Sequence, residues 1–116
     1  IINAFGALSD EVIAESASSW LSEKEQKKRA LYIAQRWPDI QARLAGSIPQ
    51  PQAIKDILAK AGAAYSPRHI NVNERLLEQT LNNAIYIRTR YTVLRLANDL
   101  GCLKSISSDI AKEALL

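Results

Sequence analysis

Apolar residues recur at spacings of three and four along most of the chain, which is the pattern of amphipathic helices. The alternating pattern of a half-buried strand is scarce, so the sequence predicts an all-α fold of about six helices. The Ser22 hydroxyl and the Glu25 carboxylate match a capping box, which predicts a helix that starts after Ser22. This helix should bury one apolar stripe and expose a charged face. Its apolar stripe consists of Ala30, Ile33, Ala34 and Trp37.

Proline, glycine and capping residues predict the boundaries in the first half of the chain. Ser9, followed by two acidic residues, should cap a helix that runs towards Trp20. Pro38 should either end or restart the helix that starts after Ser22, and a shorter helical turn then reaches Gly46. Residues 51–62 form a further helix, with a proline in its first turn and a glycine at its end.

The longest periodic run follows Asn73, a good N-cap, after a loop over residues 63–72 that holds at most one helical turn. One stripe of this run contains Leu77, Leu81, Ala84 and Arg88. We expect this helix to be largely buried.

The end of this run can be interpreted in two ways. The backbone can continue as one helix, or it can break between Arg90 and Thr92. The break is favoured, because residues 91–93 form a poor helix interior and Thr92 is a good N-cap. Gly101 then ends a short helix, and Ser107 should start the last one.

The chain has 116 residues, of which 47% are hydrophobic and 23% are charged. Residues 1–116 are therefore expected to form a single soluble globular domain that can bury a core. Its single cysteine excludes an intramolecular disulfide, and no apolar run approaches the ~18 residues of a membrane span. These features predict a cytoplasmic protein with no membrane partner. The chain holds no methionine and starts with Ile1 and Ile2, so we expect a piece of a longer protein.

The chemically richest segment covers residues 88–95, Arg-Thr-Arg-Tyr-Thr-Val-Leu-Arg, which carries three guanidiniums and a phenol. If the segment is helical, Arg88 and Tyr91 lie on one face and Arg90 points away from Arg88 by roughly 200°. A guanidinium beside a phenol suits the bidentate recognition of phosphate or carboxylate.

This segment also resembles a known family. The run Arg-x-Arg-Tyr-Thr-Val-Leu, then Leu-Ala and Asp-Leu-Gly up to residue 101, is similar to the C-terminal helical domain of glycerol-1-phosphate dehydrogenases. These enzymes belong to the superfamily of iron-containing alcohol dehydrogenase, glycerol dehydrogenase and dehydroquinate synthase. The resemblance extends upstream with less specificity, and the chain departs from it at Arg95, where an acidic residue is common, and at Asn98, where an aromatic one is.

The resemblance implies the C-terminal part of a dehydroquinate synthase-like helical domain. The whole enzyme would interconvert dihydroxyacetone phosphate and sn-glycerol 1-phosphate with NAD(P) and a divalent metal, commonly zinc. The chain's own upstream nucleotide-binding domain would then be its partner, and a homo-oligomer is a second expected assembly.

Catalytic, cofactor-binding and metal-binding residues of such an enzyme are expected outside this chain. The four glycines are scattered, so they form no phosphate-binding loop, and one histidine, His69, cannot supply two imidazole ligands. We therefore expect the chain alone to be structural and inactive.

Four residues remain as candidates for contacts with a substrate phosphate or with the other domain: Arg88, Arg90, Tyr91 and Thr92. Arg88 can either reach a substrate phosphate or form a structural ion pair with Asp99 or Glu78, and the structural interpretation is favoured.

Two other functions compete with the dehydrogenase interpretation. The chain can be a helical interaction module whose apolar stripes recruit a partner protein. It can also be a small nucleic-acid binder, although a net charge of +3 gives that function little support. The binder would place Arg88, Arg90, Tyr91 and Arg95 on phosphates.

Overall fold

The computed structural model describes residues 1–115, and this part of the chain contains helices and no strand. Seven helices of seven residues or more follow one short initial helix, which confirms the predicted all-α fold. The α-helices are α1 (Ile2–Phe5), α2 (Ser9–Ser16), α3 (Glu23–Gln35), α4 (Trp37–Leu44), α5 (Pro51–Lys60), α6 (Glu74–Asn83), α7 (Val93–Asp99) and α8 (Leu103–Glu113). Short 3₁₀ turns cover Gly6–Leu8, Ala17–Ser19, Pro67–Ile70 and Ala84–Tyr86.

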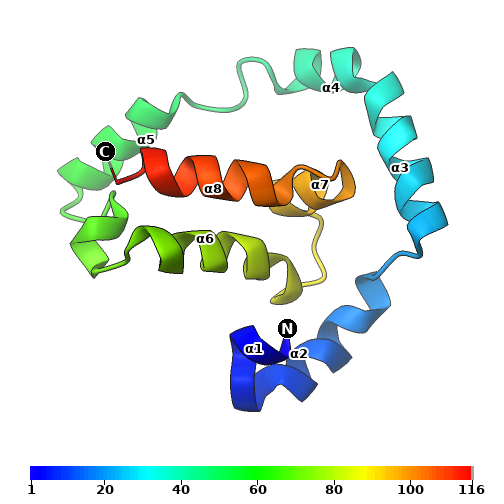
Figure 1. Ribbon diagram of the computed structural model, residues 1–116. Helices are drawn as coiled ribbons and strands as arrows, with labels where there is room; N and C mark the ends of the chain where they lie inside the picture. The colour runs from blue at the N-terminus through cyan, green and yellow to red at the C-terminus, as the bar shows by residue number, and fades with distance from the viewer. Residues whose placement is uncertain (116) are drawn as a thin grey trace.

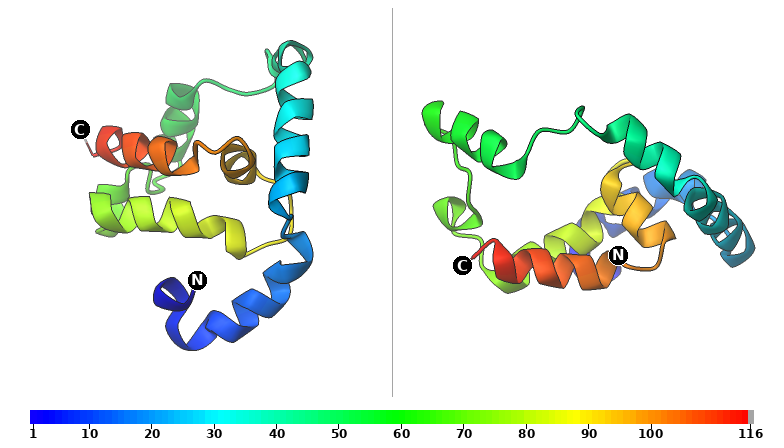
Figure 2. Two further views of the ribbon diagram at one scale, coloured as in Figure 1. Left: turned by 45° about the vertical axis from the view of Figure 1, so that its right-hand side comes forward. Right: turned by 90° about the horizontal axis from the view of Figure 1, so that it is seen from above.

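The helices are arranged as an open ring around a central pair (Figure 1). Helices α6 and α8 run antiparallel side by side in the middle, and α7 joins them at one end. The chain from α1 to α4 sweeps around one side, and α5 lies on the other. The turned views show the same open arrangement (Figure 2), which measures 44 × 43 × 22 Å.

Capping residues produce most of the predicted helix starts. The Ser22 hydroxyl accepts a hydrogen bond from the Glu25 amide at 3.4 Å, while the Glu25 carboxylate accepts one from the Ser22 amide at 2.9 Å. This reciprocal pair is the predicted capping box. In the same way, the Asn73 side chain accepts from the Leu76 amide at 2.9 Å and starts α6.

Proline and glycine set further boundaries. Helix α3 ends at Gln35 and Pro38 lies in the first turn of α4, where its missing amide hydrogen costs nothing. Pro51 starts α5 as predicted, and Gly62 follows that helix with φ of 68°, the left-handed conformation expected of a glycine there.

Two predicted helix starts are wrong. Ser9 does not cap α2; it lies in the first turn, and its hydroxyl donates to the Gly6 carbonyl at 2.6 Å, because the chain is already helical before it. The last helix starts at Leu103 and not at Ser107. Ser107 is fully buried within α8, so the packing of this face overrides its preference for a helix start.

The prediction that the helix after Asn73 is largely buried is also wrong. No residue of α6 is buried, because only α8 packs extensively along it. The helix ends at Asn83 and continues as a 3₁₀ turn, so Arg88 leaves the stripe on which the periodicity had placed it.

The core is small for a chain of this length. Among residues 1–115, five hydrophobic residues are buried, and the main cluster consists of Ile85, Ala97 and Leu103. The accessible surface is 9002 Å², whereas a compact monomer of 12.9 kDa exposes roughly 6,300 Å². The radius of gyration of 16.3 Å likewise exceeds the roughly 13 Å of a compact domain of this size. About 2,700 Å² of surface is therefore uncovered beyond what compact folding would leave.

None of the helices in residues 1–115 has the length and hydropathy needed to cross a membrane.

Candidate functional site

The arginine-rich segment is a non-helical connection between the 3₁₀ turn Ala84–Tyr86 and α7. Arg88 and Arg90 are both exposed, and neither has a carboxylate oxygen within 4.0 Å in the part of the chain that the structure describes. The chain does break before Thr92, as predicted, but α6 already ends at Asn83 and not at Arg90. Because the helix has already ended, Arg88 and Tyr91 do not share a helix face.

Thr92 caps α7, as predicted. Its hydroxyl accepts a hydrogen bond from the Arg95 amide at 3.3 Å, and its backbone is extended. At the other end of α7, Gly101 adopts φ of 74°, and its amide donates to the Asn98 carbonyl at 2.9 Å. The Cys102 amide donates to the Ala97 carbonyl at 2.9 Å, which completes a Schellman motif. Both ends of α7 are therefore fixed by local hydrogen bonds.

Tyr91 joins a cluster that holds the arginine-rich segment against α7 and α3. Its hydroxyl donates to the Asp99 carboxylate at 2.9 Å. The Arg29 guanidinium lies 3.2 Å from the same carboxylate oxygen and 5.4 Å from the centre of the Tyr91 ring. Asp99 is only 8% exposed, so its charge depends on these two partners. The partner of Asp99 is thus Arg29, and the structural ion pair predicted between Arg88 and Asp99 is not formed.

Burial raises the pKa of the Tyr91 phenol, and the hydrogen bond to Asp99 and the negative charge of Asp99 raise it further. Each of these effects favours the protonated phenol, which can donate to the carboxylate. Tyr91 therefore acts here as a hydrogen-bond donor that anchors the segment.

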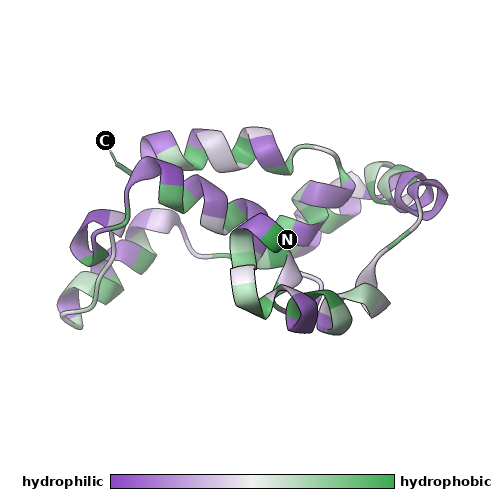
Figure 3. Ribbon diagram, turned by 60° about the horizontal axis from the view of Figure 1, so that its bottom comes forward, coloured by the Kyte–Doolittle hydropathy of each residue, from purple (hydrophilic) through white to green (hydrophobic). Residues whose placement is uncertain are grey.

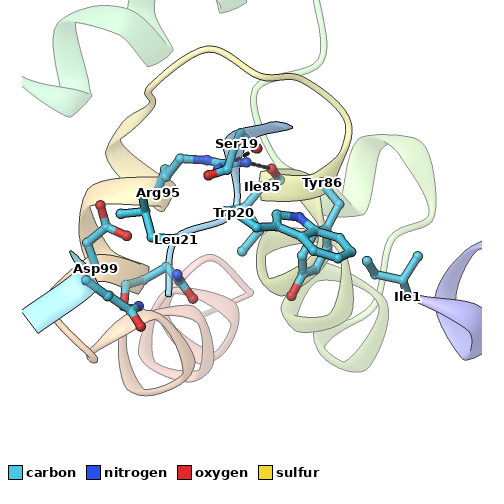
Figure 4. A pocket seen from close by; sticks show the side chains of 10 residues that line it. Ile1, Ser19, Trp20, Leu21, Ile85, Tyr86, Arg95 and Asp99 are labelled. Carbon is cyan, nitrogen blue, oxygen red and sulfur yellow. Dashed lines mark hydrogen bonds between the residues drawn. The ribbon is translucent and has the colours of Figure 1, made fainter. Parts of the chain in front are cut away.

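Arg95 lies inside the molecule and connects three segments (Figure 4). It is 8% exposed. One terminal nitrogen, Nη1, donates to the carbonyl and the hydroxyl of Ser19 at 3.0 and 2.9 Å, and Nη2 donates to the Ile85 carbonyl at 2.6 Å. Its Nε atom has no hydrogen-bond partner within residues 1–115. The guanidinium therefore ties α7 to the turn after α2 and to the turn after α6.

The position of Arg95 argues against the nucleic-acid interpretation. That interpretation required Arg95 to reach phosphates beside Arg88, Arg90 and Tyr91. Its guanidinium is instead used internally, and the Tyr91 hydroxyl is used by Asp99. Of these four residues, Arg88 and Arg90 are exposed and make no side-chain hydrogen bond or ion pair within residues 1–115.

A cavity of about 380 Å³ lies beside this network, between α3, α7 and the segments around Trp20 and Tyr86. Figure 4 shows Arg95 and Asp99 on one side of it and the indole of Trp20 on the other. The Gln26 side chain donates to the Asn98 carbonyl at 3.3 Å across one part of its wall. The two charged side chains that line it, Arg95 and Asp99, are already engaged by neighbours.

The described residues do not form a metal-binding cluster. No group of three or more His, Cys, Asp or Glu side chains that could hold a metal occurs within residues 1–115. His69 lies in the turn Pro67–Ile70, with its ring edge-on to Tyr65 at 4.5 Å between the centres. Residues 1–115 therefore contain no cluster of donors that fits the metal that the resemblance implies.

The sequence could not have revealed the partners of this network. Arg29 is 70 positions from Asp99, and Ser19 is 76 positions from Arg95. A stripe of lysine and arginine on α3 is typical of a solvated face, and nothing local distinguishes Arg29 within it. The predicted site residues are Arg88, Arg90, Tyr91 and Thr92, and the buried Arg95 and Asp99 of the same segment are not among them.

Comparison with known proteins gives one similarity. The chain is 31% identical over 87 residues to a glycerol-1-phosphate dehydrogenase [NAD(P)+] of Geobacillus stearothermophilus. The match includes 69% of this chain and 21% of the relative, so the chain spans about a fifth of that protein's length. No family model matches the chain, and no solved structure does. The chain is thus a distant, partial homologue of that dehydrogenase.

Proposed function

We propose that this chain is a helical part of an NAD(P)- and metal-dependent, cytoplasmic dehydrogenase that interconverts dihydroxyacetone phosphate and sn-glycerol 1-phosphate. The observation that carries the proposal is the 31% identity over 87 residues to a glycerol-1-phosphate dehydrogenase. The all-helical fold agrees with the helical domain that the motif in residues 88–101 implies.

In this proposal, the nucleotide and the metal are bound by another part of the same protein. The described residues supply no metal-binding cluster, and the four glycines of the sequence lie far apart. The large uncovered surface supports a chain that packs against a further domain. The helical part alone would then be inactive, and its role would be to form one wall of the cleft between the domains.

The role we propose for Arg88 and Arg90 is to bind the phosphate of the substrate. Both side chains are exposed and have no carboxylate within 4.0 Å among residues 1–115, so their guanidiniums are not neutralised there. Tyr91 anchors the segment through Asp99, and Thr92 fixes the start of α7. These two contacts would hold the backbone that carries both arginines, and guanidiniums suit bidentate binding of phosphate.

A chimera tests this function. The region of the Geobacillus stearothermophilus enzyme that aligns with this chain would be replaced by the corresponding residues of this chain. NAD(P)H-dependent reduction of dihydroxyacetone phosphate would then be measured. We expect turnover within about tenfold of the parent, which corresponds to about 1.4 kcal/mol of transition-state stabilisation. An unrelated helical segment of equal length, in the same place, is the control and should give no activity. A folded chimera no more active than this control would refute the proposal.

Variants of the chimera test the two arginines separately. Arg88→Ala combined with Arg90→Ala should raise KM for dihydroxyacetone phosphate by roughly tenfold to a hundredfold, because a hydrogen bond to a charged group contributes about 1.5–3 kcal/mol. KM for the nicotinamide cofactor should stay unchanged. Arg75→Ala, which removes an exposed arginine of α6, is the matched control. An unchanged KM in the double variant would remove both arginines from the site without affecting the family assignment.

The exposed apolar side chains favour a second function, that of a helical interaction module. An inactive chimera together with specific binding of a helical partner protein would support it over the dehydrogenase.

A further inference from the structure

The cavity beside α7 has a positive charge in its wall that no nearby carboxylate balances. Arg95 lines this cavity and is 8% exposed. The acceptors of its hydrogen bonds, the carbonyl and hydroxyl of Ser19 and the carbonyl of Ile85, are all uncharged. No carboxylate oxygen lies within 4.0 Å of its guanidinium in the part of the chain that the structure describes. A buried charge without a counter-charge is costly, so an anion in the cavity would stabilise Arg95.

The Arg95 guanidinium also has more N–H groups than its three hydrogen bonds use. Nη1 donates twice, but Nη2 donates only once, to the Ile85 carbonyl. The Nε atom is shielded from solvent and has no partner among residues 1–115. A carboxylate is the acceptor that suits a guanidinium best, because it supplies both negative charge and two oxygens.

Asp99 does not balance Arg95, because another arginine neutralises it. The Arg29 guanidinium lies 3.2 Å from the Asp99 carboxylate, and the Tyr91 hydroxyl donates to the same oxygen at 2.9 Å. The two arginines and the aspartate together carry one net positive charge. A ligand with a single negative charge would neutralise this cluster, whereas a second negative charge would be repelled by Asp99. The charges therefore favour a monoanion.

Aromatic side chains form another part of the cavity wall. Trp20 and Tyr86 both line it, and Trp20 is 48% exposed, so its ring has surface that a ligand can cover. Figure 3 shows hydrophobic and hydrophilic residues side by side along the helices, and this cavity has the same mixed character. Its volume of about 380 Å³ lies within the roughly 300–1,000 Å³ of small-molecule sites. A flat apolar group would fit against these rings.

We propose that the cavity between Arg95 and Trp20 binds a small aromatic carboxylate, with the carboxylate at Arg95 and the ring against Trp20 and Tyr86. The proposal does not depend on the dehydrogenase activity. It explains why an arginine without a carboxylate partner lines a cavity that has aromatic side chains in its wall.

Benzoate is the probe, and the two tryptophans of the chain report where it binds. When the ¹⁵N-labelled chain is titrated, the indole N–H signal of Trp20 should shift with a Kd of roughly 1 mM. The signal of Trp37, which belongs to α4 and does not line the cavity, should stay in place. Equal shifts of the two signals, or no shift of Trp20 up to about 20 mM benzoate, would overturn the proposal.

Three related compounds test which features of the ligand matter. Benzamide has the ring without the charge, and acetate has the charge without the ring, so each should bind at least about tenfold more weakly than benzoate. Phenyl phosphate is mostly dianionic at neutral pH, and it should also bind more weakly, because Asp99 repels the second charge. Binding of any of the three that equals or exceeds that of benzoate would overturn the proposal.

Arg95→Gln tests the guanidinium itself. Glutamine can still donate to the Ile85 carbonyl but carries no charge, so the affinity for benzoate should fall roughly tenfold to a hundredfold. Arg75→Gln, at an exposed position of α6 outside the cavity, is the matched control and should keep the wild-type affinity. An unchanged affinity in a folded Arg95→Gln chain would overturn the proposal.

Folding of both variants is checked by far-ultraviolet circular dichroism. If Arg95→Gln loses its helices, the comparison of benzoate with benzamide on the unaltered chain decides, and equal affinities would overturn the proposal. None of these measurements uses the chimera, so this proposal and the proposed function fail separately.

Discussion

Two buried charged residues of α7, Arg95 and Asp99, connect the centre of the molecule to its outer parts. Asp99 is held by Arg29 and Tyr91, and Arg95 donates to backbone carbonyls from two other segments. A buried charge is costly unless it is paired or hydrogen-bonded, so these contacts are needed once the side chains are inside. They give the ring fixed connections that its few buried apolar residues do not supply.

Replacing Arg95 by leucine should lower the free energy of unfolding by about 1–3 kcal/mol, because the buried Ile85 carbonyl would lose its donor. Arg90→Leu, at an exposed position three residues before α7, should change it by no more than about 0.5 kcal/mol. Urea unfolding followed by circular dichroism measures both. Equal effects for the two variants would show that the internal hydrogen bonds of Arg95 do not stabilise the fold.

Because of Tyr91, the stability of the fold should depend on pH in the alkaline range. Its pKa is higher in the folded chain than the ordinary 10.0, so folding favours the protonated phenol. This stabilisation is complete below a pH of about 10 and is lost as the pH rises through the folded-state pKa. Tyr91→Phe should remove this pH dependence and lower stability at neutral pH by about 1 kcal/mol. Stability measured against pH checks this, and an unchanged alkaline slope in the variant would contradict the hydrogen bond to Asp99.

At the scale of helices, boundaries could be predicted where the signal lies within a few residues. Ser22 with Glu25, Thr92 before α7 and Gly101 after it each fix a boundary through a local hydrogen bond or a local backbone conformation. Ser107 shows where this fails: its type favours a helix start, but its burial in α8 decides the outcome. Burial depends on residues distant in sequence, so local propensity does not predict it.

Replacing Thr92 tests the break before α7, because a broken and a continuous helix predict opposite effects of the same substitution on stability. Thr92→Ala should destabilise the chain by about 1 kcal/mol, since it removes the cap of α7. In an unbroken helix the same change would be neutral or stabilising, because alanine is the better helix former. Thr92→Ser keeps the cap and should retain most of the stability. Thermal unfolding of the three chains decides between the two structures, and a stabilised Thr92→Ala chain would contradict the break.

For the whole molecule, the sequence predicted the helices and not the way they assemble. The composition suggested a compact domain, whereas the structure is an open ring with about 2,700 Å² of excess surface. The hydrogen bonds that join α3 and the turn after α2 to α7 link positions 70 or more apart, such as Gln26 with Asn98. Such pairs leave no trace in periodicity or capping. The uncovered surface supports the proposed packing against a partner domain of the enzyme.

The central claim is that this chain can serve as the helical part of a glycerol-1-phosphate dehydrogenase. The measurement that tests it most directly is kcat/KM of the chimera for dihydroxyacetone phosphate. We predict a value within about tenfold of the parent enzyme, and a loss of roughly tenfold or more when Arg88 and Arg90 are both replaced by alanine. A folded chimera whose kcat/KM does not exceed that of the unrelated-helix control would contradict the claim.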